Sequence, residues 1–184
     1  MTTEHQARDM VTVTRASLLS LRAALLRSSD PQAAVTLQEA GYAGGSALYE
    51  AFRRWLAERT ETGIEELDLS AFQRLASEYF AESGWGTLQV GTVADAVATL
   101  DSEDWSEADP AAGAQHPSCH LTTGMFADLF GRLAGAPVAV LEVECRSAGH
   151  ARCRFLIGSP EVMDAVYEAM GNGVDYETAV KGTG

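Results

Sequence analysis

Basic residues are scarce in this sequence. Of its 184 residues, 13 are lysine or arginine and 26 are aspartate or glutamate, so the formal net charge at pH 7 is −13. Nucleic acids and anionic membrane surfaces are bound by clustered lysines and arginines. The composition therefore argues against a nucleic acid or a membrane as a partner.

Long apolar runs and a basic leader are also missing. No apolar stretch reaches the roughly 18 residues that a membrane-spanning helix needs. The first residues, from Met1 to His5, lack the basic region that opens a signal peptide. We therefore expect a soluble, cytoplasmic protein.

The residues that are present suit a globular domain. Apolar residues make up 46% of the chain and charged residues 21%, a balance typical of folded proteins. The length is that of one domain of roughly 100–200 residues, and no repeat, low-complexity tract or clear linker divides it. We expect a single domain over residues 1–184, mainly helical over 1–82, with a sheet and further helices over 84–184.

Apolar periodicity predicts helices in the first half of the chain. The predicted helices cover residues 11–27, 31–59 and 70–82. Ser28 and Ser29 separate the first two helices, and Asp30 followed by Pro31 is typical of a capped helix start.

Three glycines interrupt the second of these helices, at positions Gly41, Gly44 and Gly45. Glycine costs stability inside a helix but allows another backbone to approach closely. The glycines therefore indicate either a break in the helix or a close helix contact.

Alternating apolar and polar residues predict strands in the second half. The predicted elements are strands over residues 87–93, 94–100, 137–145 and 151–157, helices over 117–133 and 160–171, an acidic surface loop over 101–115, and a short amphipathic tail to Gly184. We expect an α+β fold, in which the helical N-terminal half packs on a small antiparallel sheet, with a cysteine-bearing helix and a C-terminal hairpin.

The chain has three cysteines: Cys119, Cys145 and Cys153. An odd number disfavours a disulfide framework and leaves buried thiols, a nucleophile or a metal site. Cys119 falls in the first turn of a predicted helix, where the helix dipole favours the thiolate. The predicted hairpin brings Cys145 and Cys153 toward each other.

A tetrahedral zinc site needs a fourth ligand. The candidates near the cysteines are Glu142, Glu144, His116, His120 and His150. Regular strand geometry puts Glu142 and Glu144 on one face and Cys145 on the other, unless the strand bends or ends there. Two simpler interpretations stay open: the thiols are ordinary core residues, or Cys119 forms a catalytic pair with a histidine, although no orienting residue is identifiable.

A motif in the second half resembles a known family. It runs His116-Pro-Ser-Cys119-His-Leu-Thr-Thr-Gly124 and continues as Glu142-x-x-Cys145-x-x-x-Gly149-x-x-x-Cys153-x-Phe155. This pattern resembles the 4-vinyl-reductase-type domain family, also called predicted hydrocarbon-binding proteins, which includes the sensor domains of phenol-responsive bacterial transcription activators. The motif covers residues 116–155.

The resemblance implies a structural zinc ion. In the phenol sensors this signature binds zinc through three cysteines and one glutamate. At the matching positions of this sequence, the implied ligands are Cys119, Glu142, Cys145 and Cys153. A zinc ion with four protein ligands has no open position for catalysis.

The resemblance also implies a pocket for a small apolar or aromatic molecule. Candidate lining residues are Tyr79, Phe80, Trp85, Trp105, Met125, Phe126 and Phe130. The function implied is that of a non-catalytic ligand-binding domain, a sensor or carrier. Because no Walker-type loop or basic segment is present, a downstream regulatory or enzyme partner, or a homodimer, would pass on the binding event.

Two alternative functions remain. An enzyme or accessory protein acting on a tetrapyrrole or aromatic substrate predicts a cleft with titratable groups such as His116, His120 or Asp128. A dimeric scaffold predicts a large exposed apolar patch over residues 11–26.

Overall fold

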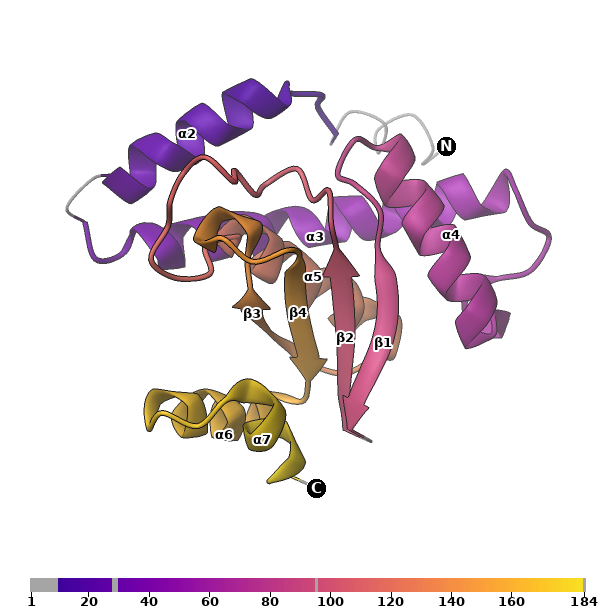
Figure 1. Ribbon diagram of the computed structural model, residues 1–184. Coiled ribbons are helices and arrows are strands. Elements are labelled where there is room, and N and C mark those ends of the chain that lie inside the picture. The colour runs from indigo at the N-terminus through magenta and orange to yellow at the C-terminus, as the bar shows by residue number, and fades with distance from the viewer. Residues whose placement is uncertain (1–9, 28–29, 95, 184) are drawn as a thin grey trace.

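The computed structural model describes residues 10–27, 30–94 and 96–183, except for the side chain of Glu65. Helices lie against both faces of one antiparallel sheet (Figure 1). The strands are β1 (Gln89–Ala94), β2 (Val97–Ser102), β3 (Ala139–Glu144) and β4 (Cys153–Gly158). The helices are α2 (Arg15–Arg27), α3 (Ala33–Ala57), α4 (Leu69–Glu82), α5 (His120–Ala134), α6 (Pro160–Gly171) and α7 (Tyr176–Lys181), with short 3-10 turns η1 (Ile64–Glu66) and η2 (Arg146–Ala148).

The sheet joins two hairpins side by side. Its strand order is β1-β2-β4-β3, and every neighbouring pair is antiparallel. The central pairing sets Leu100 of β2 opposite Phe155 of β4. This arrangement confirms the predicted α+β class, the small antiparallel sheet and the C-terminal hairpin.

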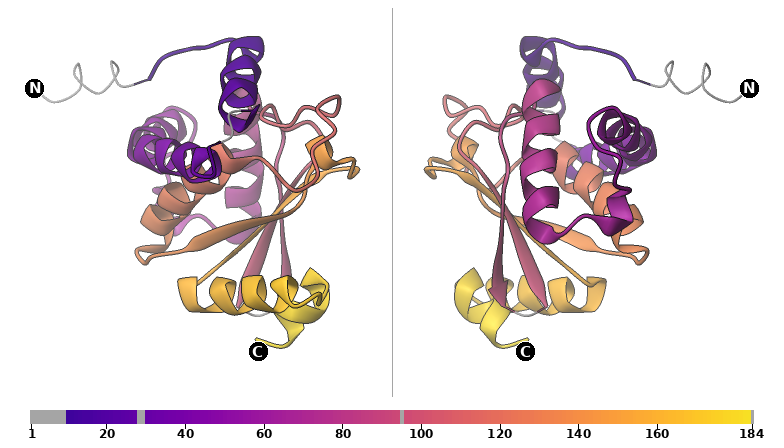
Figure 2. Two further views of the ribbon diagram at one scale, coloured as in Figure 1. Left: turned by 90° about the vertical axis from the view of Figure 1, so that its left-hand side faces the viewer. Right: turned by 90° about the vertical axis from the view of Figure 1, so that its right-hand side faces the viewer.

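Alternation along β4 divides the core into two layers. Phe155 and Ile157 point toward α3, α4 and α5 and belong to the larger apolar cluster, whereas Leu156 points to the opposite face and packs with α6 and α7. The side views in Figure 2 show α3, α4 and α5 against one face and α6 with α7 near one end of the sheet.

Short polar side chains set where several helices begin. The Asp68 side chain accepts a hydrogen bond from the Ala71 N–H at the start of α4, so this helix begins at Leu69 and not at Ser70 as predicted. Asp175 caps α7 in the same way, so the predicted tail is a helix.

The first helix is shorter than predicted. The Thr14 hydroxyl accepts a hydrogen bond from the Ser17 N–H, and α2 begins at Arg15, so Val11 precedes the helix. The predicted break at Ser28 and Ser29 lies outside the described residues.

The second helix also begins later than predicted. The Asp30 carboxylate accepts a hydrogen bond from the Gln32 N–H in the turn before α3 rather than capping the helix, and α3 starts at Ala33. The helix ends at Ala57, two residues before the predicted end at Arg59.

The glycines of α3 mark a close helix contact. α3 continues through all three of them, and a Cβ added to Gly41 would lie 1.9 Å from the Leu121 carbonyl oxygen of α5. Reciprocally, a Cβ on Gly124 of α5 would lie 1.9 Å from the Gln38 carbonyl oxygen of α3. The close-contact interpretation is therefore correct, and the helix does not break.

Boundaries in the second half shift by a few residues. β2 spans Val97–Ser102 instead of 94–100, and α5 begins at His120 instead of Pro117. The segment after β2 is not simply a surface loop, since Trp105, Glu107 and Ala108 are completely buried. No helix in the described ranges is long and apolar enough to cross a membrane.

Candidate metal centre

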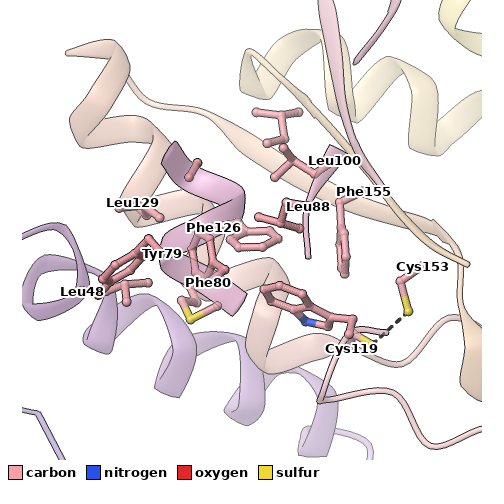
Figure 3. Packing of buried hydrophobic residues seen from close by; sticks show 14 of the residues in the cluster. Leu48, Tyr79, Phe80, Leu88, Leu100, Cys119, Phe126, Leu129, Cys153 and Phe155 are labelled. Carbon is pink, nitrogen blue, oxygen red and sulfur yellow. Dashed lines mark hydrogen bonds between the residues drawn. The ribbon is translucent and has the colours of Figure 1, made fainter. Parts of the chain in front are cut away.

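Four buried side chains meet where α5 begins beside the C-terminal hairpin. Cys119 directly precedes α5, Glu142 lies on β3, Cys145 follows β3, and Cys153 opens β4. Their ligand atoms all lie within 4.8 Å of one another. Figure 3 shows Cys119 and Cys153 pointing toward each other at the edge of the aromatic core.

A β-bulge brings Glu142 and Cys145 to the same side of the sheet. The pairing of β3 with β4 shifts between Glu142 and Glu144, so Val143 is an extra residue. In a regular strand, residues three apart point to opposite faces, and one extra residue reverses this relation.

The bulge also separates the two glutamates, so the expectation that they share a face is wrong. Glu144 points away from the cysteines and accepts hydrogen bonds from Arg152, at 3.0 and 3.2 Å, and from the Tyr176 hydroxyl at 2.6 Å. Arg154 binds Asp101 on the same face. These arginines therefore do not compensate charge at the cysteine cluster.

The sulfur separations fit a shared metal ion. The Cys119 Sγ lies 3.7 Å from the Cys145 Sγ and 4.0 Å from the Cys153 Sγ. Sulfurs bound tetrahedrally to zinc at about 2.3 Å would be separated by about 3.8 Å, whereas a disulfide needs about 2.05 Å. All three cysteines are free.

The carboxyl group of Glu142 lacks a partner on one side. Its Oε2 accepts a hydrogen bond from the Cys119 N–H at 2.7 Å, while Oε1 is buried without a hydrogen-bond partner. Burial, and then the negative charge of Cys145, raise the pKa of Glu142 to about 9. A divalent cation would supply the missing partner of Oε1 and favour the carboxylate, so this donor set fits a zinc ion.

Backbone groups support the sulfur atoms. Hydrogen bonds from Cys119 and Cys153 lower the pKa of Cys145, and the Ser118 N–H also donates to it. The Arg146 N–H donates to Cys153. The pKa of Cys119 is raised, first by its hydrogen bond to Cys145, so the expected effect of the helix dipole on this thiol does not prevail.

The histidines and Asp128 lie outside this cluster. His116 is exposed, and the exposed His150 accepts a hydrogen bond through Nδ1 from the Cys145 N–H at 3.1 Å. Burial and then the Arg22 charge lower the pKa of His120. Asp128 accepts a hydrogen bond of 2.6 Å from Arg132.

Sequence analysis missed the polar groups behind the cluster. The buried carboxylate of Glu107 accepts hydrogen bonds from the backbone N–H groups of Leu121, at 3.1 Å, and Thr122, at 2.8 Å, at the start of α5. Arg22 of α2 lies 3.6 Å from Glu107. Local periodicity carries no signal for either residue, because one falls in a loop and the other in an apolar helical stripe.

The seven predicted pocket residues lie in or against the main apolar core. Their rings contact one another: the Phe126 centroid lies 5.3 Å from that of Trp105 and 5.7 Å from that of Phe80, and the Trp85 and Trp105 rings stack at 5.6 Å. Tyr79 packs on Phe80. These side chains therefore fill space between the sheet and the helices.

A hollow of about 590 Å³ lies beside this aromatic cluster. Phe130, one of the seven predicted residues, lines it and contacts Phe126 at 5.5 Å between ring centroids. The other lining residues are Tyr49, Ile64, Phe72, Arg132, Leu133, Ala134, Gly135, Val138 and Ile157. The sequence carried no signal for this surface, because its residues come from α3, η1, α4, α5, the turn after α5 and β4.

Solved structures share this fold. The phenol-responsive sensory domain of the transcription activator PoxR, determined with phenol, aligns with a TM-score of 0.60 and 20% identity over 83% of this chain and 77% of that one. A trafficking protein particle complex subunit 3 from Naegleria fowleri, covalently bound to palmitic acid, aligns with a TM-score of 0.56 and 12% identity over 78% of this chain and 91% of that one.

A vinyl-4-reductase family protein from Methanocaldococcus jannaschii aligns less well, with a TM-score of 0.40 and 16% identity over 80% of this chain and 95% of that one. No curated protein sequence matches the chain significantly. A family model does match: residues 101–159 fit the 4-vinyl-reductase-type domain, and this stretch contains all four residues of the cluster. The family indicated by the cysteine–glycine motif is thus confirmed, and residues 101–159 belong to the 4-vinyl-reductase-type domain family.

Proposed function

We propose that this chain is a non-catalytic binding domain for a small apolar or aromatic molecule, stabilised by a structural zinc ion. The observation that carries the proposal is the apolar hollow bordered by Phe72, Phe130 and Ile157. Its volume of about 590 Å³ lies within the range of roughly 300–1,000 Å³ that small-molecule sites occupy. The shared fold with a sensory domain determined with phenol supports an aromatic ligand.

The proposed zinc ligands are Cys119, Glu142, Cys145 and Cys153. With four protein ligands, the ion would leave no open position for activating water, so its contribution is cross-linking. The cluster joins the start of α5 to both strands of the hairpin. Because α5 and β4 also line the hollow, this link would hold two of its walls together.

The groups that an enzyme would use are dispersed along α5 and the segment before it. His120 and Asp128 are eight residues apart on α5, which corresponds to about 12 Å of helix. Asp128 is paired with Arg132. This geometry supports binding over catalysis, with the reduced cytoplasm, where free thiols persist, as the proposed location.

Filling the hollow should abolish ligand binding. Leu133 lines the hollow, and Leu133→Trp would occupy part of its volume. Calorimetry with phenol and 1-naphthol should show binding to the wild-type chain and at least about tenfold weaker binding to the variant, a loss of about 1.4 kcal/mol.

Tyr167→Trp is the matched control, because Tyr167 is an exposed residue of α6 that does not line the hollow. It should bind both probes like the wild type. Absence of binding to the wild type would refute an aromatic ligand, and equal affinities of wild type and Leu133→Trp would refute this location.

A second copy of the chain is the proposed protein partner. Val11, Val13 and Leu21 are each more than 60% exposed in and before α2, as the dimer prediction requires. Light scattering should give the mass of a dimer for the wild type and of a monomer for Leu21→Glu. Tyr167→Glu, at a position with the same 66% exposure, should stay dimeric, and a monomeric wild type would contradict the prediction.

A further inference from the structure

α2 is attached to the rest of the protein by two arginines on one of its faces. Arg15 donates hydrogen bonds to the carbonyl oxygens of Ser106 and Ala108, and Arg22 donates to the carbonyl oxygen of Ser118. The arginines are seven residues apart, so both project from the same side of the helix. Figure 2 shows α2 lying above the segment that connects β2 to α5.

Arg22 is the one buried arginine or lysine among the described residues. Its Nε and Nη2 lie 3.1 and 2.9 Å from the Ser118 carbonyl oxygen, and Nη2 also donates to the Ser118 hydroxyl. Its guanidinium pairs with the buried Glu107, which binds the first backbone N–H groups of α5. Burying such a pair costs desolvation energy, and breaking it leaves an uncompensated charge.

One peptide group connects Arg22 to the cysteine cluster. The carbonyl oxygen of the Ser118–Cys119 peptide accepts from Arg22, and the N–H of the same peptide donates to Glu142 Oε2 at 2.7 Å. The preceding N–H, that of Ser118 itself, donates to Cys145. A charged donor on the carbonyl both orients this peptide and strengthens the hydrogen bond at its other end.

We propose that Arg22 is a positioning residue for the metal centre, and that occupancy of the centre controls how firmly α2 is held. The inference rests on the zinc site of the proposed function and adds a dependence of that site on a helix about a hundred residues away in the sequence. Linkage makes the effect reciprocal, so zinc stabilises the docking of α2 by as much as docked α2 stabilises zinc.

Zinc affinity in an Arg22 variant tests the proposal. Arg22→Met keeps the length of the side chain but removes its donors and charge. Competition with a chromophoric zinc chelator should give a 10- to 100-fold weaker affinity, as found when outer partners of metal ligands are removed. Arg15→Met, which removes the same groups from the same helix face without touching Ser118, should bind zinc within threefold of the wild type.

A double variant covers the case in which Arg22→Met does not fold. Arg22→Met with Glu107→Gln leaves no unpaired buried charge, and it should show the same 10- to 100-fold loss because Ser118 is still unsupported. Hydrogen exchange of the wild type is the independent measurement: removing zinc should accelerate exchange of α2 amides while those of α6 change little.

The outcomes separate the two proposals. A wild-type chain that binds no zinc would refute the zinc site, and this inference with it. A wild type that binds zinc, with Arg22→Met as tight as Arg15→Met or α2 exchange independent of zinc, would overturn only the role of Arg22.

Discussion

Glu142→Gln should weaken zinc binding by at least about 100-fold, more than the loss of an outer-shell partner causes. The amide has nearly the shape of the carboxylate but no negative charge, and the buried Oε1 that has no protein partner would no longer be an anionic ligand. Elemental analysis and chelator competition measure the effect. The wild type should contain about one zinc per chain, and its three thiols should react with a thiol reagent only after a chelator is added.

Glu144→Gln is the matched control. It is the same substitution two residues further along the chain, but Glu144 is bound by Arg152 and Tyr176 on the opposite face of the sheet. We expect its zinc content and thiol protection to equal those of the wild type. Metal-free wild-type protein with freely reactive thiols would refute the site, and equal zinc loss in both variants would refute Glu142 as the specific ligand.

Gly41→Ala should lower the free energy of unfolding by about 3 kcal/mol or more, the upper range for overpacking. The new Cβ would lie 1.9 Å from the Leu121 carbonyl oxygen and 2.9 Å from the Met125 nitrogen. Both contacts are backbone atoms of α5, so relief requires separation of the two helices. Urea denaturation or a thermal melt would detect the change, since 1 kcal/mol shifts Tm by about 2–4 °C in a chain of this size.

Gly44→Ala supplies the comparison from the same helix. A Cβ at Gly44 meets nothing within 4 Å, so the variant should gain about 0.5–1 kcal/mol from the higher helix propensity of alanine. The contrast between two identical substitutions three residues apart isolates the helix contact. If Gly41→Ala were as stable as Gly44→Ala, the tight packing of α3 against α5 would be wrong.

The helix and strand content of the protein could be predicted because it depends on local patterns. Apolar periodicity of 3.6 and 2 residues marks α3, α4 and the two hairpins regardless of what packs against them. Errors occurred mainly at element boundaries, which depend on single caps: Asp68 and Thr14 start their helices through side-chain hydrogen bonds that a hydropathy pattern does not register.

The candidate ligands could be proposed by resemblance, but their convergence could not be derived from spacing. Regular strand geometry places Glu142 and Cys145 on opposite faces, and a single extra residue, Val143, reverses that relation. Whether a strand contains a bulge depends on its pairing with the neighbouring strand. Local sequence therefore predicted the wrong face for Glu144.

The polar network behind the cluster shows the same limit. Arg22 and Glu107 are 85 positions apart, and each looks ordinary within its own segment. Their burial depends on α2 and the segment after β2 meeting at the start of α5. No local pattern encodes such a meeting.

The amino-acid sequence alone determined the elements, the α+β class and the four residues suspected of binding metal, because these follow from local periodicity and a short motif. The folded chain decided which glutamate faces the cysteines, which glycines touch a neighbouring helix, and where an apolar hollow remains. Each of these depends on distances between segments remote in sequence. Such distances are set by packing, in which every element is positioned by all the others.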